Sequence, residues 1–133
     1  MRRPQEPPTW LPYCPYYAAA SQTLSRRWAA TVLRALVTGP KRFGEIGSAI
    51  PDMTDKLLSQ RLKDLEDDGL VERVLGSDRP ARVQYKLTEK GAALGQILLD
   101  LNRWALKWVD LPEHRGSPNL ATADMTQTPS DTK

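Results

Sequence analysis

Residues 54–69, TDKLLSQRLKDLEDDG, constrain the fold of this chain more than any other segment. Leu58, Leu62 and Leu65 recur at the i, i+4 and i+7 spacing of a buried helical stripe. Thr54 is a residue type that caps the start of a helix, and Gly69 is the type that ends one in a left-handed conformation. The segment therefore predicts one amphipathic helix with a defined start and end.

The side of this helix opposite the leucines is cationic and rich in hydrogen-bonding groups. With about 100 degrees between successive residues, four polar side chains fall together there: Lys56, Ser59, Gln60 and Lys63. A solvated helix face has the same character, because charged outer faces are the rule. The acidic residues 66–68 crowd the carboxyl end, where the helix dipole disfavours them, so that end should point away from phosphates. Residues 54–63 are thus the candidate surface for a DNA groove.

Residues 41–51, KRFGEIGSAIP, predict a shorter helix just before this one. Phe43, Ile46 and Ile50 stand at i, i+3 and i+7, and the helix must stop before Pro51. A turn at residues 51–53 then leads into the longer helix. This succession is the helix-turn-helix pattern, although the same pairing occurs in many unrelated helical proteins.

After the longer helix the apolar period changes to two. Residues 70–75, LVERVL, and 82–88, RVQYKLT, predict two strands, and the polar tip at 76–80 makes them a hairpin. Arg79 in the tip and Arg82 at the start of the returning strand place cations beside the helix. A helix-turn-helix followed by a hairpin is the winged-helix arrangement. The predicted fold class is therefore mainly α with a small β-hairpin wing.

One domain, residues 13–110, accounts for the periodic part of the chain, which matches a typical domain of about 100 to 150 residues. Residues 1–12 are rich in proline and predict an extended arm. A helix is permitted from Tyr16 to a break near Ser25, and a core helix follows. Its apolar stripe consists of Trp28, Ala29, Val32, Leu33 and Leu36. From residue 111 onward the sequence lacks periodicity and predicts a disordered tail.

A final helix, capped by Thr88 and running to about residue 110, carries an apolar seam. The seam consists of Leu94, Ile97, Leu98, Leu101, Trp104 and Trp108. An ordinary core helix is possible, but a small winged fold offers one helix limited area to bury, so we expect a homodimer interface. Gly91 and Gly95 each weaken the helix by up to about 1 kcal/mol against alanine, so packing must hold it.

Composition permits nucleic-acid binding without demanding it. The net charge is +3 and the pI about 9.2, and residues 54–90 carry eight cations and eight anions, sorted by face. No run of 18 apolar residues is present for a membrane span, and no apolar segment follows the two amino-terminal arginines. We therefore expect a cytoplasmic protein that binds double-stranded DNA and has no membrane partner.

Enzymatic function is not expected. His114 is the only histidine and falls in the tail, so no His-based triad and no site with two histidine ligands can form within a chain. No phosphate-cradling glycine loop is visible. The single cysteine, Cys14, excludes an intramolecular disulfide and a metal site built on several thiolates. No cofactor and no metal are predicted.

Several ordered motifs resemble the HxlR-type winged-helix regulators of bacteria over about residues 14–109. They are CP at 14–15, RRW at 26–28, GPKRFGEI at 39–46, LLSQRLKDLEDDGLVER at 57–73 and RPARVQYKLTEKG at 79–91. The resemblance implies a homodimer, built from the amino-terminal and last helices, that binds an inverted-repeat operator and regulates transcription. It implies DNA contacts by Lys56, Ser59, Gln60, Lys63, Arg79 and Arg82. Arg42 and Thr54 complete the predicted set of DNA-binding residues.

Within that resemblance, the polar face of residues 56–63 enters the major groove, and Arg79 and Arg82 contact the flanking backbone or minor groove. Two positions depart from the family pattern. Ser25 and Arg26 stand where the family has paired glycines. Asp55 stands where a cation would be safer beside DNA, although it can support the amino end of the helix dipole.

Cys14 is the candidate sensor, because the corresponding cysteine of several HxlR-type relatives responds to electrophiles, quinones or oxidants. Arg26 and Arg27 would lower its pKa if they approached it in space. The alternative is a small buried apolar residue without reactivity. With one cysteine per chain, switching requires a Cys14–Cys14 bridge between subunits, a mixed disulfide with a small thiol, or alkylation.

Two further alternatives concern ligands and partners. The aromatic residues of the two ends could line a pocket for a planar small-molecule effector, or could simply be interface core. They are Trp10, Tyr13, Tyr16, Tyr17, Trp104 and Trp108. The chain could also be a winged-helix dimer that binds a protein partner and has only weak affinity for DNA. The salt dependence of DNA binding distinguishes that alternative from an operator-binding regulator.

Overall fold

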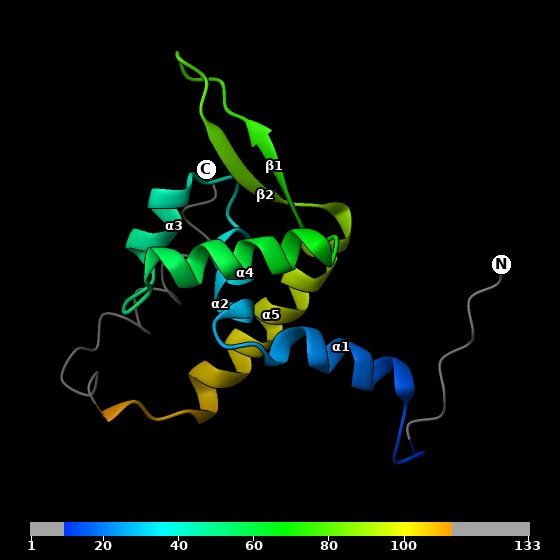
Figure 1. The fold of residues 1–133 in the computed structure, drawn as a ribbon. Coiled ribbons are helices and arrows are strands. Elements are labelled where there is room, and N and C mark those ends of the chain that lie inside the picture. Colours follow the sequence, from blue (N-terminus) through cyan, green and yellow to red (C-terminus); the bar gives the residue numbers. More distant parts are fainter. Residues whose placement is uncertain (1–9, 113–133) are drawn as a thin grey trace, which may run out of the picture. The chain divides into compact units, whose positions relative to one another are not determined.

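The structure, a computed structural model, describes residues 10–112. Its elements in chain order are α1 (Pro15–Ser25), α2 (Ala29–Ala35), α3 (Phe43–Ala49), α4 (Asp55–Asp67), β1 (Val71–Leu75), β2 (Val83–Leu87) and α5 (Glu89–Trp108) (Figure 1). This order confirms the predicted fold class, mainly α with a hairpin wing. The chain forms two compact units, one ending at Gln96 and the other beginning at Ile97 within α5.

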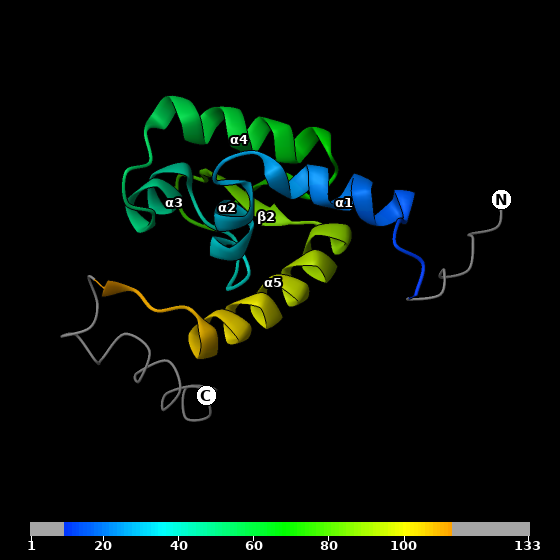
Figure 2. The same cartoon turned by 90° about the horizontal axis from the view of Figure 1, so that it is seen from below.

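The core of the first unit lies where α2 packs against α3 and α4 (Figure 2). The leucine stripe of α4 is buried there, as its spacing predicts, together with apolar residues of α2, α3 and β1. The largest fully buried side chains are Val32, Leu33, Leu36, Ile46, Leu58, Leu62 and Leu65, and Val71 of β1 is also buried. Burying one such side chain contributes about 1.5 to 3 kcal/mol, so this cluster holds α4 in place.

Helix α4 begins and ends where its sequence predicts. The Thr54 hydroxyl accepts a hydrogen bond from the backbone N–H of Leu57 at 3.1 Å, which satisfies an otherwise unpaired donor of the first turn. Gly69 has a φ of 78°, the left-handed region that favours glycine, and its N–H donates to the carbonyl of Glu66. Lys90 donates to the carbonyl of Asp68 at 2.6 Å and closes the same end. Hydrogen bonds at both ends therefore fix where α4 begins and ends, and none of them uses the polar side chains at positions 56–63.

Helix α2 is shorter than the predicted core helix, because its apolar stripe runs from Trp28 to Leu36 and the helix itself covers only Ala29–Ala35. Trp28 has a φ of 74° and caps α2 rather than joining it, and its side chain is half-buried. The predicted break at Ser25 is found, because α1 ends there and Arg26 is extended. Ala29 and Leu36, by contrast, are buried as predicted.

The wing is an antiparallel hairpin in which Val71 pairs with Leu87 and Leu75 pairs with Val83. The N–H of Gly76 donates to the carbonyl of Arg82 at 2.8 Å, which adds one pair and makes residues 77–81 the unpaired tip instead of 76–80. Lys41 forms two backbone hydrogen bonds with Tyr85, at 3.0 and 2.8 Å. The segment before α3 therefore holds β2 in place, which the sequence pattern did not indicate.

Glycine at position 91 serves a close approach between segments. The Thr88 hydroxyl accepts from the N–H of Gly91 at 3.0 Å, confirming the predicted cap. Gly91 lies in the first turn of α5, and a Cβ there would overlap the carbonyl of Leu70. Gly91 is therefore not in the helix interior, where the sequence pattern indicated it, and the absence of a side chain there admits the backbone of Leu70.

The predicted ends of the chain lie largely outside the described residues. Residues 10–12 are irregular, whereas residues 1–9 of the predicted arm, residues 113–133 of the predicted tail and His114 are not described. Within residues 10–112 no helix is long and apolar enough to cross a membrane.

Candidate nucleic-acid interface

The outer face of α4 carries its predicted polar side chains in the exposed state. Lys56, Ser59, Gln60 and Lys63 are all exposed. Neither lysine forms an ion pair within residues 10–112, so the two ammonium groups are available to an anionic partner. Thr54 is also exposed, but its hydroxyl oxygen already accepts the capping bond from Leu57. Its place at the amino end remains compatible with a phosphate contact.

Two of the three acids at the carboxyl end of α4 form ion pairs within the chain. Asp68 pairs with Arg26 at 3.2 Å, and Glu66 pairs with Arg73 at 2.9 Å. Arg26 stands where the family pattern has glycine, and as the carboxyl cap of α1 it joins that helix to α4. These pairs reduce the repulsion that the acids would exert on a polyanion.

Arg42 connects α3 to the wing. Its Nη2 atom lies 3.1 Å from Oδ2 of Asp78 at the wing tip. Its backbone N–H donates to Oε1 of Glu45 at 2.7 Å, which caps the start of α3. The Nε atom is buried and has no hydrogen-bond partner in the part of the chain that the structure describes. The guanidinium is therefore only partly satisfied.

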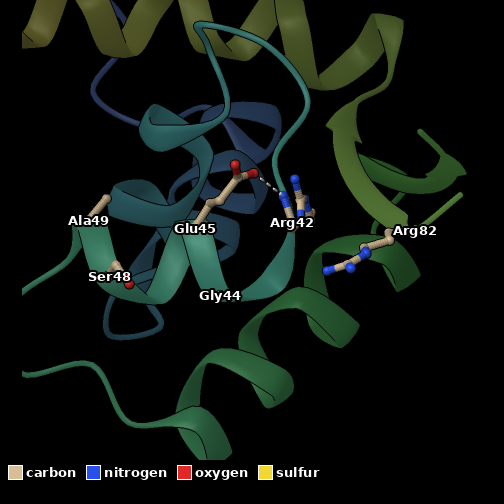
Figure 3. Close-up of a pocket in the computed structure, with 6 residues that line it drawn as sticks. All are labelled: Arg42, Gly44, Glu45, Ser48, Ala49 and Arg82. Atoms are coloured by element: carbon tan, nitrogen blue, oxygen red, sulfur yellow. Dashed lines mark hydrogen bonds between the residues drawn. The ribbon is translucent and has the colours of Figure 1, made fainter. Parts of the chain in front are cut away.

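A groove of about 730 Å³ lies between α3 and the wing (Figure 3). It is lined by Arg42, Gly44, Glu45, Ser48, Ala49 and Arg82. Arg42 and Arg82 supply cations, and Arg79 is exposed at the adjoining tip. The sequence pattern predicts these arginines but gives no prediction for the α3 residues. The available signal for this groove is the run of small residues on the side of α3 away from its apolar stripe, namely Gly44, Ser48 and Ala49.

Cys14 caps the amino end of α1, and its side chain is half-buried and makes no capping hydrogen bond. Arg26 caps the other end of the same helix, about 18 Å away at 1.5 Å per residue. Arg27 lies over the ring of Trp28, 5.3 Å from its centroid. Within the described chain these arginines are therefore not placed beside Cys14, because α1 lies between Cys14 and Arg26.

The predicted effector and dimer residues are mostly exposed in the single chain. Trp10, Tyr13, Tyr16 and Tyr17 in one unit, and Trp104 and Trp108 in the other, each expose more than half of their surface. Along the α5 seam Leu94 is half-buried and Leu98 buried, whereas Ile97 and Leu101 are exposed. Both the effector pocket and the dimer interface stay predictions. No cluster of three or more metal-ligating side chains occurs among residues 10–112.

A helix-turn-helix whose second helix presents an exposed polar face, flanked by a cationic hairpin, defines the winged helix-turn-helix class of DNA-binding proteins. Residues 23–113 match the family described as HxlR-like helix-turn-helix. The chain belongs to this family and is a DNA-binding transcriptional regulator.

Individual relatives agree with this assignment. The HTH-type transcriptional regulators YvaP and YodB of Bacillus subtilis are 42% and 41% identical, over 73% and 69% of this chain and 90% and 82% of theirs. The reduced form of B. subtilis YodB superposes with a TM-score of 0.63 at 39% identity, covering 74% of this chain and 96% of that one. The oxidized form of the redox regulator HypR superposes with a TM-score of 0.64 at 31% identity, covering 74% of this chain and 100% of that one.

Proposed function

We propose that this regulator binds an inverted-repeat operator as a homodimer, with the first two turns of α4 in the major groove. The observation that carries the proposal is the exposed, ion-pair-free state of Lys56 and Lys63 on the same helix face as Ser59 and Gln60. Lysines of this kind contact phosphates, and the shorter polar side chains are of the type that reads base edges.

The α3–wing groove supplies the flanking contacts in this proposal. Arg42 and Arg82 line it, and Arg79 is exposed beside it. Wings and the residues before a reading helix commonly meet the sugar-phosphate backbone, where cations are needed and base identity is not. These arginines therefore contribute affinity and orientation, and α4 contributes sequence preference.

The exposed apolar part of α5 supports the homodimer. Ile97, Leu101, Trp104 and Trp108 expose 61%, 54%, 57% and 65% of their surfaces. Contiguous apolar patches of several large side chains are uncommon on monomeric proteins and mark interaction sites. A two-fold dimer built through α5 presents two copies of α4, which matches an inverted repeat.

We further propose that Cys14 senses an electrophile or thiol oxidant. Structures of quinone-bound and diamide-treated YodB are 39% and 38% identical to this chain. With a quinone, the Cys14 thiolate adds to a ring carbon, a C–S bond forms, and the ring takes up a proton to become a hydroquinone thioether. With diamide, two thiols lose two electrons and two protons to form a disulfide, and the diazene takes up both. The second thiol comes from the other subunit or from a small thiol, because each chain has one cysteine.

An aromatic effector held without a covalent bond is the second candidate for the signal. It is supported by the exposed ring of Tyr17 and its neighbours Trp10, Tyr13 and Tyr16. Substituting Cys14 separates the two mechanisms, since a bound planar ligand does not need the thiol. With either mechanism, the protein acts in the cytoplasm, where it binds DNA.

The test is the salt dependence of DNA binding by the full-length protein. A fluorescently labelled duplex, first selected from a randomised library, is titrated at several KCl concentrations. We expect a steep loss of affinity with salt, and Lys63→Ala should reduce the log–log slope by about 1.8, because the dimer loses one phosphate contact in each half-site. Lys107→Ala, which removes the same charge from the end of α5, is the matched control and should leave the slope unchanged. A flat salt response would favour the protein-partner alternative.

A further inference from the structure

Gln60 is the exposed amide on the reading face of α4, and its side chain is held by a neighbour. Its Nε2 atom donates a hydrogen bond to Oδ1 of Asp64 at 3.0 Å. The two residues stand at i and i+4, so they lie one above the other on the helix surface. Gln60 therefore has a preferred side-chain position before DNA arrives.

Asp64 is itself fixed from outside α4. Its side chain is only 18% exposed, and Oδ2 accepts from Nη1 of Arg61 at 2.8 Å. Arg61 donates through Nε to the backbone carbonyl of Arg27 at 2.7 Å, and Arg26 lies 3.9 Å from the same carboxylate oxygen. The carboxylate is therefore anchored to the segment between α1 and α2. These cations also neutralise it, so it can lie near a reading surface without strong repulsion of phosphate.

The Asp64 contact determines how the Gln60 amide is oriented. An ionised carboxylate can only accept hydrogen bonds, so the amide nitrogen, and not its oxygen, must face Asp64. One N–H and the oxygen Oε1 then remain. Gln60 thus retains one donor and one acceptor for contact with a base.

Of the four bases, only adenine offers the complementary pair in the major groove, an N7 acceptor beside an N6 donor. Guanine presents two acceptors, N7 and O6, and would need two donors. Cytosine and thymine each satisfy a single group of the amide, through N4–H or O4. A fixed amide therefore discriminates more strongly than a freely rotating one, because the unfavourable pairings cannot be relieved by rotation.

We propose that Asp64 is a positioning residue that sets Gln60 to read one adenine in each operator half-site. This inference rests on the proposed DNA-binding function and adds a base identity and a residue outside the predicted DNA contacts. Asp64 acts through Gln60 and need not touch the base.

The experiment compares the sequences that full-length variants select from a randomised duplex library. The variants are the natural chain, Gln60→Ala, Asp64→Ala and the matched control Asp67→Ala, which removes an exposed acid from the same helix. We expect an A·T base pair, with the adenine on either strand, at the half-site position where Gln60→Ala loses its preference. At that position the preference for the A·T pair over the other base pairs should fall about tenfold in Asp64→Ala, whereas Asp67→Ala should retain it. Loss of either acid is expected to raise overall affinity similarly, so base preference is the decisive quantity.

Thermal denaturation of each variant separates positioning from folding. If Asp64→Ala does not fold, Asp64→Glu keeps the charge but moves the carboxylate by one methylene, and the same loss of preference is expected. A G·C pair at the Gln60-dependent position, in either orientation, would overturn the inference, because neither strand then offers an adenine. So would unchanged preference in the folded Asp64 variant, or no position that depends on Gln60. If the natural chain enriches no sequence at all, the proposed DNA-binding function fails first.

Discussion

Nη2 of Arg42 and Oδ2 of Asp78 lie 3.1 Å apart, so the residue that caps α3 is ion-paired with the tip of the wing. The two side chains are 37% and 56% exposed, and a pair so close to solvent contributes at most about 1 kcal/mol. A DNA phosphate can therefore take the place of the Asp78 carboxylate at little cost. The Lys41–Tyr85 backbone bonds hold the other end of the wing in any case.

Asp78→Ala should strengthen DNA binding by about threefold to tenfold, as expected when a competing carboxylate is removed from a phosphate-binding arginine. The slope of log affinity against log salt should steepen by about 1.8 as Arg42 becomes available for one more phosphate in each half-site. Anisotropy titrations over a salt series measure both quantities. Asp67→Ala controls for the change in net charge, and Arg42→Ala in the Asp78→Ala background should abolish the gain. If affinity rises equally in both single acid variants, Arg42 has no special part in it.

Gly91→Ala should destabilise the fold, because the new Cβ would overlap the carbonyl of Leu70 and the backbone must move. The expected loss in unfolding free energy is about 1 to 3 kcal/mol, the usual cost of overpacking. Urea unfolding followed by circular dichroism measures it. Gly44→Ala in α3 is the matched control, since nothing lies within 4 Å of its Cβ position, and it should stabilise by about 0.4 to 1 kcal/mol. Equal effects at the two sites would contradict the close approach.

Cys14→Ser should leave DNA affinity within about twofold, since the side chain makes no capping bond that the structure describes. It should abolish the response of DNA binding to diamide and to a quinone. Intact-mass spectrometry should find one quinone adduct on the natural chain and none on the variant. With diamide, a reducible dimer or a small-thiol adduct is expected. Persistent quinone sensitivity in Cys14→Ser would instead support the aromatic pocket.

Leu101→Asp should convert the dimer to a monomer, because a carboxylate would have to be buried in an apolar interface. Light scattering coupled to size-exclusion chromatography measures the mass. Loss of the second α4 should weaken binding to a two-half-site duplex by at least about 100-fold, while binding to a single half-site changes little. Asp100→Asn on the same helix is the control, as that residue is exposed and pairs only locally with Arg103 in the described chain. A variant that stays dimeric would exclude Leu101 from the interface.

Residues 54–69 show how much of the candidate site local sequence could predict. The Thr54 cap, the buried leucines and the Gly69 termination all depend on spacing within one helix, and each is confirmed. The exposure of Lys56 and Lys63 follows from the same periodicity, because burying one side of a helix leaves the opposite side to solvent. Their contacts with DNA stay a prediction.

The partners of the polar side chains could not be predicted in this way. Arg42 and Asp78 are 36 residues apart, and Arg61 and Arg27 are 34 apart. Nothing in either local pattern distinguishes these arginines from solvated ones. The Lys41–Tyr85 bridge likewise joins a loop to a strand with no signal in its periodicity.

The sequence by itself determined the order of the elements, the side of each helix that is buried and the types of side chain available on the outer face of α4. Those properties follow from apolar spacing and from capping residues, which act over a few positions. Only the tertiary structure decided that Arg61 joins Asp64 to the backbone of Arg27, that Asp78 pairs with Arg42 and that Arg26 pairs with Asp68. These relationships arise once the core has set where the helices and the wing lie, because a polar side chain pairs with whatever the fold brings within reach.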